Sequence, residues 1–306
     1  MSGKVAVLGC GTMAGALIGG LIDADTVKAD DVVATARSES HRDEIARTLG
    51  VKTTADNAEA ARDADLVILG VKPYAAAGVL EEVADSLKDD AIIISIAAGV
   101  TTEKLLAAWQ GNVVRVMPNT PVRVGKGAFI VSPAPGAEEA GEKVVEILGT
   151  VGRVVEVPEK LHDAATAVSG SGPAYVFLVA EAMIDAAVAM GLPRDQACQL
   201  TVATLAGSAE LLAGDEHPAV LRSEVTSPGG TTAAALAELE AGGLRATFAD
   251  AMTACRDRAA CPDGSARRFW LDCRSQRKVI LCPPCRWAEN FAPTRVHQTS
   301  SSNERG

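Results

Sequence analysis

The sequence is poor in the residues from which most catalytic centres are built. Aromatic residues make up only 3% of the 306 residues, and the chain has four histidines. The three histidines before residue 255 do not have metal-ligand spacing, and no Gly-x-Ser-x-Gly nucleophile turn occurs there. We therefore expect neither a bound metal nor a serine nucleophile in this part of the chain.

The chain also lacks a long uncharged apolar run. The best window, residues 174–190, is interrupted by Glu181 and Asp185, which argues against a membrane span. No secretory leader precedes the first strand-like run, and the first 254 residues hold only Cys10 and Cys198. A net charge of -10 disfavours a nucleic-acid partner. Together these absences predict a soluble, cytoplasmic protein.

Residues 255–306 differ in composition from the rest. They carry a net charge of +5, against -15 for residues 1–254, and hold five of the seven cysteines. The pair Cys282 and Cys285 suggests a zinc or redox site, but the other cysteines there lack paired spacing. We interpret this stretch as an atypical, disordered tail translated from a shifted reading frame, and expect the preceding helix to lose its pattern near Cys255.

Short apolar runs rich in β-branched residues alternate with helix-period segments in the first half of the chain. The early runs are apolar throughout, as expected for parallel strands buried on both faces. That order predicts βαβ units and a doubly wound parallel sheet. The expected strands are Val5–Leu8, Val32–Thr35, Val51–Thr53, Leu66–Gly70, Ile92–Ala97, Val113–Met117, Ala128–Val131 and Arg153–Val157.

After Lys160 the strand signal stops. Three helical segments follow, at residues 173–190, 193–213 and 231–240, separated by glycine-containing breaks. The first is apolar almost all round, so we expect it to be buried in a helix bundle or a subunit interface. The predicted fold class is therefore α/β, with an N-terminal Rossmann-like doubly wound sheet followed by an all-helical C-terminal domain.

A glycine motif follows the first expected strand and opens the first helix. Gly9 permits a tight turn, Gly11 lets backbone amides approach a pyrophosphate, and Ala14 keeps the helix close to the sheet. The helix N-terminus then faces the phosphates of a dinucleotide cofactor. An ordinary strand–helix turn is the alternative. The residues expected to bind the pyrophosphate are Gly9, Cys10, Gly11, Thr12 and Met13.

The end of the second expected strand indicates which dinucleotide binds. An NAD-dependent enzyme usually has Asp or Glu there to bind the ribose hydroxyls. This chain has Arg37 followed by Ser38, and a guanidinium pairs bidentately with phosphate oxygens. The sequence therefore favours NADPH, with NADH as the second choice. In the alternative interpretation, Arg37 is a solvated residue at a helix start.

Ligands of open α/β sheets bind at the carboxyl ends of the strands. The turns after the fourth and fifth expected strands should therefore line the cofactor groove, although Lys72 could equally be a surface lysine. The next strand is followed by the segment Met117–Pro121, in which two prolines either present side chains rigidly or make a rigid turn. The groove-lining residues are expected to be Val71, Lys72, Pro73, Ile96, Ala97 and Ala98.

Two loops rich in small residues open later helices and leave their amides free for an anionic group, although each could be no more than a capped helix. Since no metal cluster, nucleophile or acid–base pair is evident before residue 255, the cofactor must supply the chemistry, and hydride transfer fits. The loop residues are Ser169, Gly170, Ser171 and Gly172 in the first, and Gly230, Thr231 and Thr232 in the second.

Residues 3–254 resemble pyrroline-5-carboxylate reductases. Four segments occur in the same order as in that family, namely Val71–Pro73, Met117–Pro121, Ser169–Tyr175 and Val225–Thr232. The resemblance implies reduction of the cyclic imine 1-pyrroline-5-carboxylate to L-proline by NAD(P)H, the last step of proline biosynthesis. The substrate is a small molecule that bears a carboxylate.

The resemblance also implies roles for individual residues. Thr231 and Thr232 look like the substrate residues, and we expect the Thr232 hydroxyl to hydrogen-bond the ring nitrogen as the one catalytic contact. Asn57 would line the cofactor groove, and Asp215, shortly before His217-Pro218, matches an acidic residue of the family.

The same resemblance implies an oligomer. The family's helical domain forms an intertwined dimer that builds higher rings, so each active site would use two chains. We therefore place a dinucleotide-binding domain at residues 1–158 and a helical substrate and dimerisation domain at residues 159–254.

Two alternatives stay open. A β-hydroxyacid dehydrogenase would have a similar layout, but those enzymes rely on a lysine in the helical domain, and residues 161–254 contain none. The other alternative is a nucleotide-binding regulatory protein that kept the fold and lost turnover.

Overall fold

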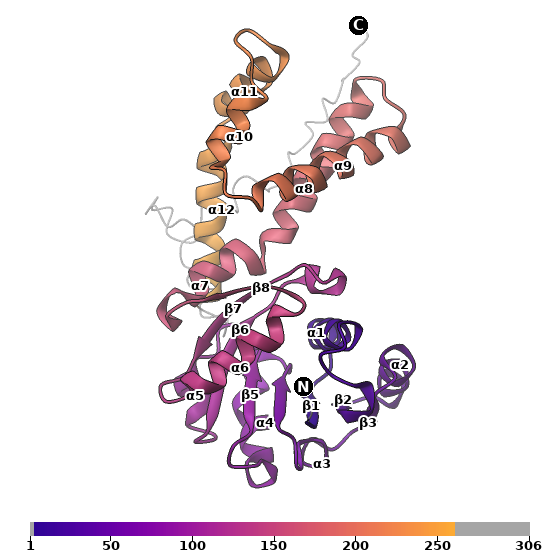
Figure 1. Cartoon of the computed structure of the whole chain (residues 1–306), viewed down its shortest axis with the longest axis vertical. Helices are drawn as coiled ribbons and strands as arrows, with labels where there is room; N and C mark the ends of the chain where they lie inside the picture. The colour runs from indigo at the N-terminus through magenta and orange to yellow at the C-terminus, as the bar shows by residue number, and fades with distance from the viewer. Residues whose placement is uncertain (1–2, 261–306) are drawn as a thin grey trace, which may run out of the picture. The chain divides into compact units, whose positions relative to one another are not determined.

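The computed structural model describes residues 3–260. Their sheet has eight strands in the order β3-β2-β1-β4-β5-β6-β7-β8, flanked by helices (Figure 1). All eight expected strands are present, with ends within two residues of the prediction. The strands are β1 (Val5–Leu8), β2 (Val32–Thr35), β3 (Lys52–Thr54), β4 (Leu66–Leu69), β5 (Ile92–Ser95), β6 (Asn112–Met117), β7 (Gly127–Pro133) and β8 (Gly152–Glu156).

The first six strands run parallel, and β1 lies between β2 and β4, with Val5 opposite Val32 on one side and Leu66 on the other. Every residue of β1, β4 and β5 is buried, which explains why these strands are apolar, with Ser95 at the end of β5 as the one polar residue among them. The chain reverses its direction of travel across the sheet at β1. The carboxyl end of β1 is therefore the topological switch point where such sheets bind ligands.

One pair of strands departs from the expected parallel sheet. Strands β6 and β7 pair antiparallel, with Val116 opposite Val131, whereas β7 and β8 are again parallel. The connection between β6 and β7 consists only of residues 118–126 and contains the short 3-10 helix η4 (Thr120–Val124). A parallel crossover needs a dozen or more residues, so this short proline-containing link dictates the antiparallel pairing.

Three of the helices match, to within one residue at each end, the helical segments expected after Lys160. Those around the sheet are α1 (Thr12–Asp23), α2 (Glu39–Leu49), α3 (Asn57–Ala61), α4 (Ala76–Val83), α5 (Thr102–Leu106) and α6 (Glu138–Gly149). The helices after the sheet are α7 (His162–Ala165), the π-helix η6 (Thr166–Gly170), α8 (Gly172–Ala189), α9 (Arg194–Leu212), α10 (Pro218–Glu224), α11 (Thr231–Ala241) and α12 (Leu244–Ala259).

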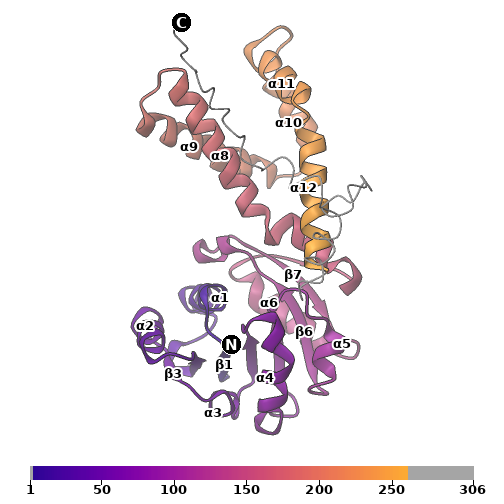
Figure 2. The same ribbon diagram turned by 180° about the vertical axis from the view of Figure 1, so that it is seen from behind.

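The long apolar helix α8 is not covered within the chain. It lies beside α9 in both views (Figures 1 and 2), yet none of its residues is buried. Phe177 and Leu178 are 59% and 65% exposed. The continuous stretch Glu159–Ala189 is long and apolar enough to cross a membrane by length and composition alone, and none of its most apolar window is buried.

Helix α12 continues to Ala259, past Cys255, where the sequence pattern suggested that it would end. Its Cys255 therefore belongs to a regular helix. The disordered-tail interpretation covers residues 255–306, of which 255–259 are helical in the structure. Residues 261–306, with the zinc alternative for Cys282 and Cys285, lie outside the described part of the chain.

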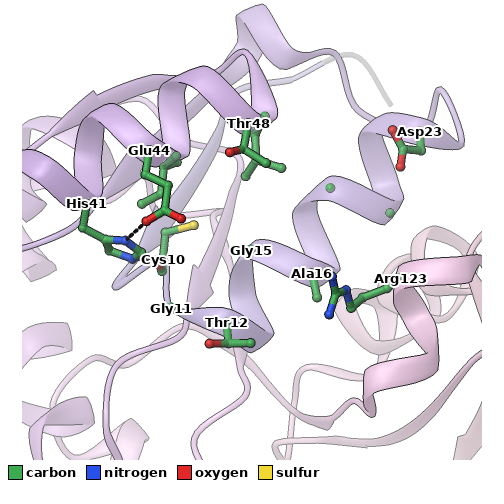
Figure 3. A pocket seen from close by; sticks show the side chains of 14 residues that line it. Cys10, Gly11, Thr12, Gly15, Ala16, Asp23, His41, Glu44, Thr48 and Arg123 are labelled. Carbon is green, nitrogen blue, oxygen red and sulfur yellow. Dashed lines mark hydrogen bonds and ion pairs between the residues drawn. The ribbon is translucent and has the colours of Figure 1, made fainter.

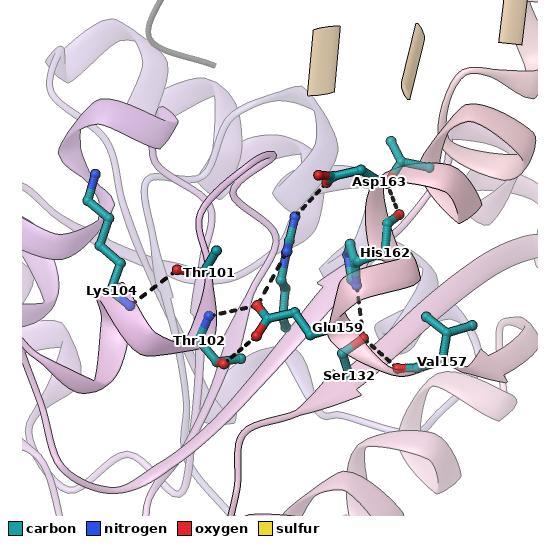
Figure 4. Close-up of polar contacts among 10 residues, drawn as sticks. Thr101, Thr102, Lys104, Ser132, Val157, Glu159, His162 and Asp163 are labelled. Carbon is teal, nitrogen blue, oxygen red and sulfur yellow. Dashed lines mark hydrogen bonds and ion pairs between the residues drawn. The ribbon is translucent and has the colours of Figure 1, made fainter. Parts of the chain in front are cut away.

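A buried arginine joins the sheet to the first turns of the helical region (Figure 4). Arg115 on β6, whose side chain is 4% exposed, donates from Nη1 to Glu159 Oε1 at 3.3 Å and from Nη2 to Asp163 Oδ1 at 3.1 Å. Thr102 at the start of α5 donates its amide and its hydroxyl to the two oxygens of Glu159, at 2.7 and 2.6 Å. Burial alone would raise the pKa of Glu159, but the bonds from Thr102 and the charge of Arg115 outweigh it and hold that pKa below its usual value.

His162 is fully buried beside this ion pair. Ser132 Oγ donates its single proton to the carbonyl of Val157 at 2.8 Å, so the 3.0 Å contact between Ser132 Oγ and His162 must be donated by His162 Nδ1. Burial, reinforced by the charge of Arg115, lowers the pKa of His162 to about 4. The imidazole is therefore neutral at physiological pH, and the charges at this junction are Arg115, Glu159 and Asp163.

We predict that Arg115→Met destabilises the chain by about 2–3 kcal/mol, because it leaves two carboxylates without their cation. The loss stays below the ~3–5 kcal/mol of a fully buried pair, since the side chains of Glu159 and Asp163 are 28% and 30% exposed. Urea unfolding at matched chain concentration measures the change.

The matched control is Arg245→Met, which removes the exposed ion pair between Arg245 and Glu240 on α12 and α11. That change should cost much less than Arg115→Met, because the pair is exposed to solvent and screened by it. Equal losses in the two variants would mean that the Arg115 junction contributes no more than a surface ion pair.

Candidate cofactor and substrate site

The glycine turn lies at the carboxyl end of β1, where the sheet switches direction. Gly9 has φ +78°, and a Cβ there would lie 2.5 Å from Val71 Cγ1, so both the backbone conformation and the neighbouring strand end require glycine. Gly11 is the N-cap of α1; it is exposed, and a Cβ built on it meets nothing within 4 Å. No side chain caps α1, so its first amides are free to bind an anion.

Cys10, in the centre of this turn, contributes through its backbone. Its side chain is buried, and burial raises the pKa of the thiol to about 11, so it is neutral and unreactive at physiological pH. The Cys10 amide donates to the carbonyl of Thr35 at 2.8 Å, and its carbonyl lies 3.0 Å from His41 Nε2 on α2. The turn is thereby tied to β2 and to α2.

A groove of about 400 Å³ lies beside the turn, between α1 and α2 (Figure 3). Its α1 wall consists of small residues, including Gly15, Ala16 and Gly19, and its other wall carries the polar side chains of His41 and Glu44. The glycine turn closes one end of the groove, and Gly11 and Thr12 lie there. The structure thus leaves open space next to the free amides of α1.

The end of β2 places a cation close to the glycine turn. Arg37 and Ser38 are both exposed, and Ser38 is the N-cap of α2, with a hydroxyl that makes no capping bond. Arg42, one turn into α2, donates from Nη1 to the carbonyls of Ala36 and Arg37, both at 3.0 Å. Arg42 therefore fixes the backbone that carries Arg37. Within residues 3–260, the Arg37 guanidinium makes no hydrogen bond or ion pair.

Asn57, the first residue of α3, is part of a hydrogen-bond chain under the glycine turn. The amide of Gly9 donates to Thr35 Oγ1 at 2.9 Å, and that hydroxyl donates to Asn57 Oδ1 at 2.8 Å. Asn57 Nδ2 donates to Glu82 Oε1 on α4 at 3.3 Å. Three segments expected to contact a cofactor thus meet through one buried threonine.

The other expected groove residues lie at the carboxyl ends of β4 and β5, as parallel pairing requires. Lys72 is exposed, and Val71 and Pro73 are half-buried. In the turn after β5, Ile96 is half-buried, Ala97 is buried and Ala98 is exposed. The site holds what a dinucleotide needs: a glycine cradle, uncapped helix amides, open space and an exposed arginine at the end of β2.

The Ser169–Gly172 loop lies at a π-helical turn. The π-helix η6 ends at Gly170 and leads directly into α8, with Pro173 in the first turn of that helix. Such local widening of a helix is frequent at functional sites. A Cβ on Gly170 would lie 3.0 Å from the methyl of Thr166 and 3.3 Å from Met117 Cγ, so the loop packs closely against the end of β6.

Asn119 explains the Met117–Pro121 segment. Its side chain is buried; Nδ2 donates to the carbonyl of Ser169 at 3.0 Å, and Oδ1 accepts from the amide of Ala128 on β7 at 2.8 Å. The segment was expected either to present side chains rigidly or to be no more than a rigid turn. In the structure it is a turn that presents the side chain of Asn119. That side chain holds the Ser169–Gly172 loop against the sheet.

On the opposite side, the loop contacts α12. The Oγ of Ser171 lies 3.1 Å from Cys255 Sγ. Tyr175 packs edge-on against Phe248, with ring centroids 6.4 Å apart. The part of α12 beyond the expected boundary at residue 254 therefore contributes to the surroundings of the expected substrate loop.

The Gly230–Thr232 corner is shaped for a helix start. Gly229 has φ +69°, the Gly230 amide donates to the Ser227 carbonyl at 3.0 Å, and Gly230 is the N-cap of α11 without a side-chain cap. Thr231 is exposed and Thr232 half-buried. Asp215 is exposed just before α10, whose N-cap His217 accepts from the amide of Ala219.

The structure does not join every expected site residue. The glycine turn and Asn57 form one hydrogen-bonded group, and the Ser169–Gly172 loop is tied to the sheet through Asn119. In the described chain, however, no hydrogen bond or ion pair joins residues 218–243 to residues 3–158. The corner with Thr231 and Thr232 is therefore not hydrogen-bonded to the cofactor turn of the same chain.

Relatives of similar sequence are found in bacteria and in plants. The pyrroline-5-carboxylate reductase of Corynebacterium melassecola is 43% identical over 261 residues, which span 83% of this chain and 96% of the relative. That of Arabidopsis thaliana is 38% identical over 259 residues, which span 83% of this chain and 94% of the relative. This chain belongs to the pyrroline-5-carboxylate reductase family.

Solved structures of the pyrroline-5-carboxylate reductase family have the same fold. The enzyme from Coxiella burnetii matches with a TM-score of 0.77 at 37% identity, covering 85% of this chain and 98% of that one. The Plasmodium falciparum pyrroline carboxylate reductase, solved with NADP bound, also matches with a TM-score of 0.77, at 33% identity, covering 85% of this chain and 97% of that one. The Rossmann-like sheet followed by a helical region is thus confirmed.

Two family models match separate parts of the chain. Residues 4–99 match the model for NADP oxidoreductase coenzyme F420-dependent proteins, and residues 159–261 match the model for pyrroline-5-carboxylate reductase dimerisation. The second match extends seven residues beyond the boundary at 254 drawn from sequence, in line with the length of α12. The chain therefore carries the dimerisation region of a pyrroline-5-carboxylate reductase through the end of α12.

Sequence reasoning missed three residues of the site. Thr35 reads as an ordinary β-branched strand residue, and Arg42 as one more charge on an amphipathic helix. His41 was noted only as lacking metal-ligand spacing. Each of these side chains hydrogen-bonds to backbone groups. Since every residue has a backbone, the sequence does not show which one is the partner. The available hint was position, because Thr35 ends the second strand of a glycine-motif unit and the other two residues follow it shortly afterwards.

Proposed function

We propose that the chain catalyses the NADPH-dependent reduction of 1-pyrroline-5-carboxylate to L-proline, the last step of proline biosynthesis. The observation that carries the proposal is the similarity to pyrroline-5-carboxylate reductases, at 37–43% identity, over more than four-fifths of the chain. The uncapped glycine turn and the Gly-Gly-Thr-Thr corner support it. The reaction adds a hydride to the carbon of the ring C=N bond and a proton to the nitrogen.

The residues of the glycine turn fit the pyrophosphate of the coenzyme. The free amides at the start of α1, those of Thr12 and Met13, would donate to phosphate oxygens. Gly9, Cys10 and Gly11 set the path of the turn, and the Gly11 amide donates to the Gly9 carbonyl at 2.8 Å. The turns after β4 and β5, together with Asn57, would line the rest of the groove. When bound, NADPH supplies the hydride.

Arg37 and Ser38 would select the phosphorylated coenzyme. Arg42 holds the backbone of this turn, and the Ser38 hydroxyl makes no capping bond, so both side chains are available to a 2′-phosphate. A guanidinium donates two parallel hydrogen bonds to phosphate oxygens. NADH lacks that phosphate and would lose these contacts.

Thr232 would orient the imine. Its hydroxyl would hydrogen-bond the ring nitrogen, which becomes basic as hydride arrives, and protonation of the imine before reduction makes a strong general acid unnecessary. Backbone amides at Gly230 and Thr231, together with the Ser169–Gly172 loop, would hold the substrate carboxylate. Asp215 would lie at the rim of this site.

Each active site would be shared by two chains. The corner with Thr231 and Thr232 makes no hydrogen bond to the cofactor domain of its own chain, and α8 exposes large apolar side chains. An intertwined dimer through residues 159–254 would cover α8 and bring one chain's corner to the partner's glycine turn, and such dimers would assemble into rings. Residues 1–158 would form the cofactor domain, and the assembly would reside in the cytoplasm.

We predict that Thr232→Ala lowers kcat/KM for pyrroline-5-carboxylate by about tenfold to a hundredfold, equivalent to ~1.4–2.7 kcal/mol, since the orienting hydrogen bond is lost. The affinity for NADPH should stay within about twofold. Steady-state oxidation of NADPH and a binding titration measure the two quantities. Thr232→Ser, which keeps the hydroxyl, is the control and should retain most of the rate; an unchanged rate in Thr232→Ala would discard the assigned role.

We predict that Arg37→Ala raises the Kd for NADPH by about tenfold or more, because charge-assisted hydrogen bonds to the 2′-phosphate are worth ~1.5–3 kcal/mol. The Kd for NADH should change less than about threefold. Parallel binding titrations with both coenzymes provide the test. The control is Arg47→Ala, an exposed cation later on α2, and equal effects of Arg37→Ala on both coenzymes would refute the phosphate contact.

We predict that Phe177→Glu lowers the native mass from an oligomer to a single chain, because it puts a charge into the apolar face of α8 that the partner would cover. Light scattering of the folded variant measures the mass. Val124→Glu, at a 74% exposed apolar residue of η4, adds the same charge outside the helical region and should leave the mass unchanged. A Phe177→Glu protein with the wild-type mass would contradict an interface on this face.

A further inference from the structure

A buried threonine lies beneath the cofactor turn. Thr35, the last residue of β2, is 3% exposed. Its hydroxyl bonds to the Gly9 amide at 2.9 Å and to Asn57 Oδ1 at 2.8 Å, while its carbonyl accepts from the Cys10 amide at 2.8 Å. One residue therefore contacts both the glycine turn after β1 and the first residue of α3.

The directions of these hydrogen bonds are fixed by chemistry. The Gly9 amide can only donate, so the Thr35 hydroxyl oxygen accepts from it. The single proton of that hydroxyl is then donated to Asn57 Oδ1. The carboxylate of Glu82 can only accept, so it takes the Nδ2 hydrogen of Asn57 at 3.3 Å. The carboxamide of Asn57 thus has one orientation that satisfies both neighbours.

Loss of the Thr35 hydroxyl would disturb two cofactor-binding elements at once. The Gly9 amide would be left without its acceptor under the turn, and Asn57 would lose the donor that fixes its carboxamide. The peptide bond between Gly9 and Cys10 would then be held by the single bond from Cys10 to the Thr35 carbonyl. A polar group left unpaired in a buried site is costly, so the turn would shift to find another partner.

We propose that Thr35 is a positioning residue of the cofactor site, which acts by fixing the Gly9 turn and the Asn57 carboxamide rather than by touching the coenzyme. The inference rests on the proposed function only in taking a nicotinamide dinucleotide as the ligand. The Thr35 hydroxyl bonds to Gly9 and Asn57 and makes no bond to Arg37 or Ser38. Its influence is therefore on the part of the site that NADPH and NADH share.

This placement separates Thr35 from Arg37. Substitution of a residue that binds the 2′-phosphate changes the affinity for NADPH alone. Substitution of a residue that positions the turn used by both coenzymes changes both affinities by the same factor. A purely structural threonine would change thermal stability and leave the affinity of the folded protein for either coenzyme unaltered. The ratio of the two Kd values and their absolute size together distinguish the three roles.

The test uses Thr35→Val, which keeps the shape and removes the hydroxyl, beside Thr35→Ser, which keeps the hydroxyl and removes the methyl. We expect Thr35→Val to raise the Kd of NADPH and of NADH each by about tenfold, and Thr35→Ser to change either by less than about threefold. Fluorescence titration of the full chain with each reduced coenzyme measures both. The KM for pyrroline-5-carboxylate at saturating NADPH should stay within about twofold.

A double-mutant cycle with Asn57→Ala tests the route of the effect. If Thr35 acts partly through Asn57, the combined variant binds NADPH more tightly than the product of the two single losses predicts. Should Thr35→Val not fold, Thr35→Cys replaces it with the same expectation, because a thiol is a weak donor and acceptor.

Three results overturn the proposal: wild-type affinity for both coenzymes in the folded Thr35→Val protein, a loss confined to NADPH, or strict additivity with Asn57→Ala. A wild-type chain that binds coenzyme but leaves pyrroline-5-carboxylate unreduced refutes the proposed function and leaves the Thr35 test standing. A wild-type chain that binds neither coenzyme refutes both.

Discussion

The contact on which the rest of the site depends is the one between the Gly9–Gly11 turn and the end of β2. Two successive amides of the turn, Gly9 and Cys10, donate to the hydroxyl and the carbonyl of Thr35. With these two amides turned inward, the remaining free amides of the segment belong to the start of α1, where no side chain competes for them. The inward bonds thereby determine which donors face an anion.

A second set of buried polar contacts fixes the loop at the start of α8. Arg115 binds Glu159 and Asp163 just before and within α7, and Asn119 binds the Ser169 carbonyl at the end of the π-helical turn. Both anchors come from β6 or its following turn. Because the carboxyl end of β6 is on the same edge of the sheet as the glycine turn, the loop is held at the edge where parallel strands present their ligand-binding turns.

The sequence predicted the central strands β1, β4 and β5 well because each is a short, mostly apolar run between clear breaks, as expected for a strand buried on both faces. The outer strands β3 and β8 are less apolar and less buried. The antiparallel turn between β6 and β7 could not be read the same way, since an apolar run is identical in either direction and only the length of the link discriminates. The continuation of α12 past Cys255 was missed for a different reason. The change in composition there was read as a change in structure, although alanine and arginine are good helix formers.

Site residues divide along similar lines. Gly9 could be predicted because its positive φ and its close approach to Val71 exclude other residue types. Gly11 and Thr232 were named only from motifs, and their roles stay predictions. Arg115, Thr35 and Asn119 act through partners 22 to 50 residues away in sequence, and nothing local identifies those partners. The Met117–Pro121 segment was singled out for its prolines, whereas its buried, bonded member is the asparagine between them.

Two features of the helical region have one explanation. Among residues 3–260, helix α8 belongs to a long apolar stretch, yet none of its residues is buried. Within the same residues, 218–243 make no hydrogen bond to residues 3–158. Exposure of so many apolar side chains opposes the hydrophobic effect at about 25 cal/mol per Å² of apolar surface, so a partner surface is needed. In the proposed dimer, a second copy would supply that surface, and its Gly230–Thr232 corner would lie at a neighbouring cofactor turn. In that proposal the main contribution of the protein to the rate would be the orientation of the two bound molecules, coenzyme and imine.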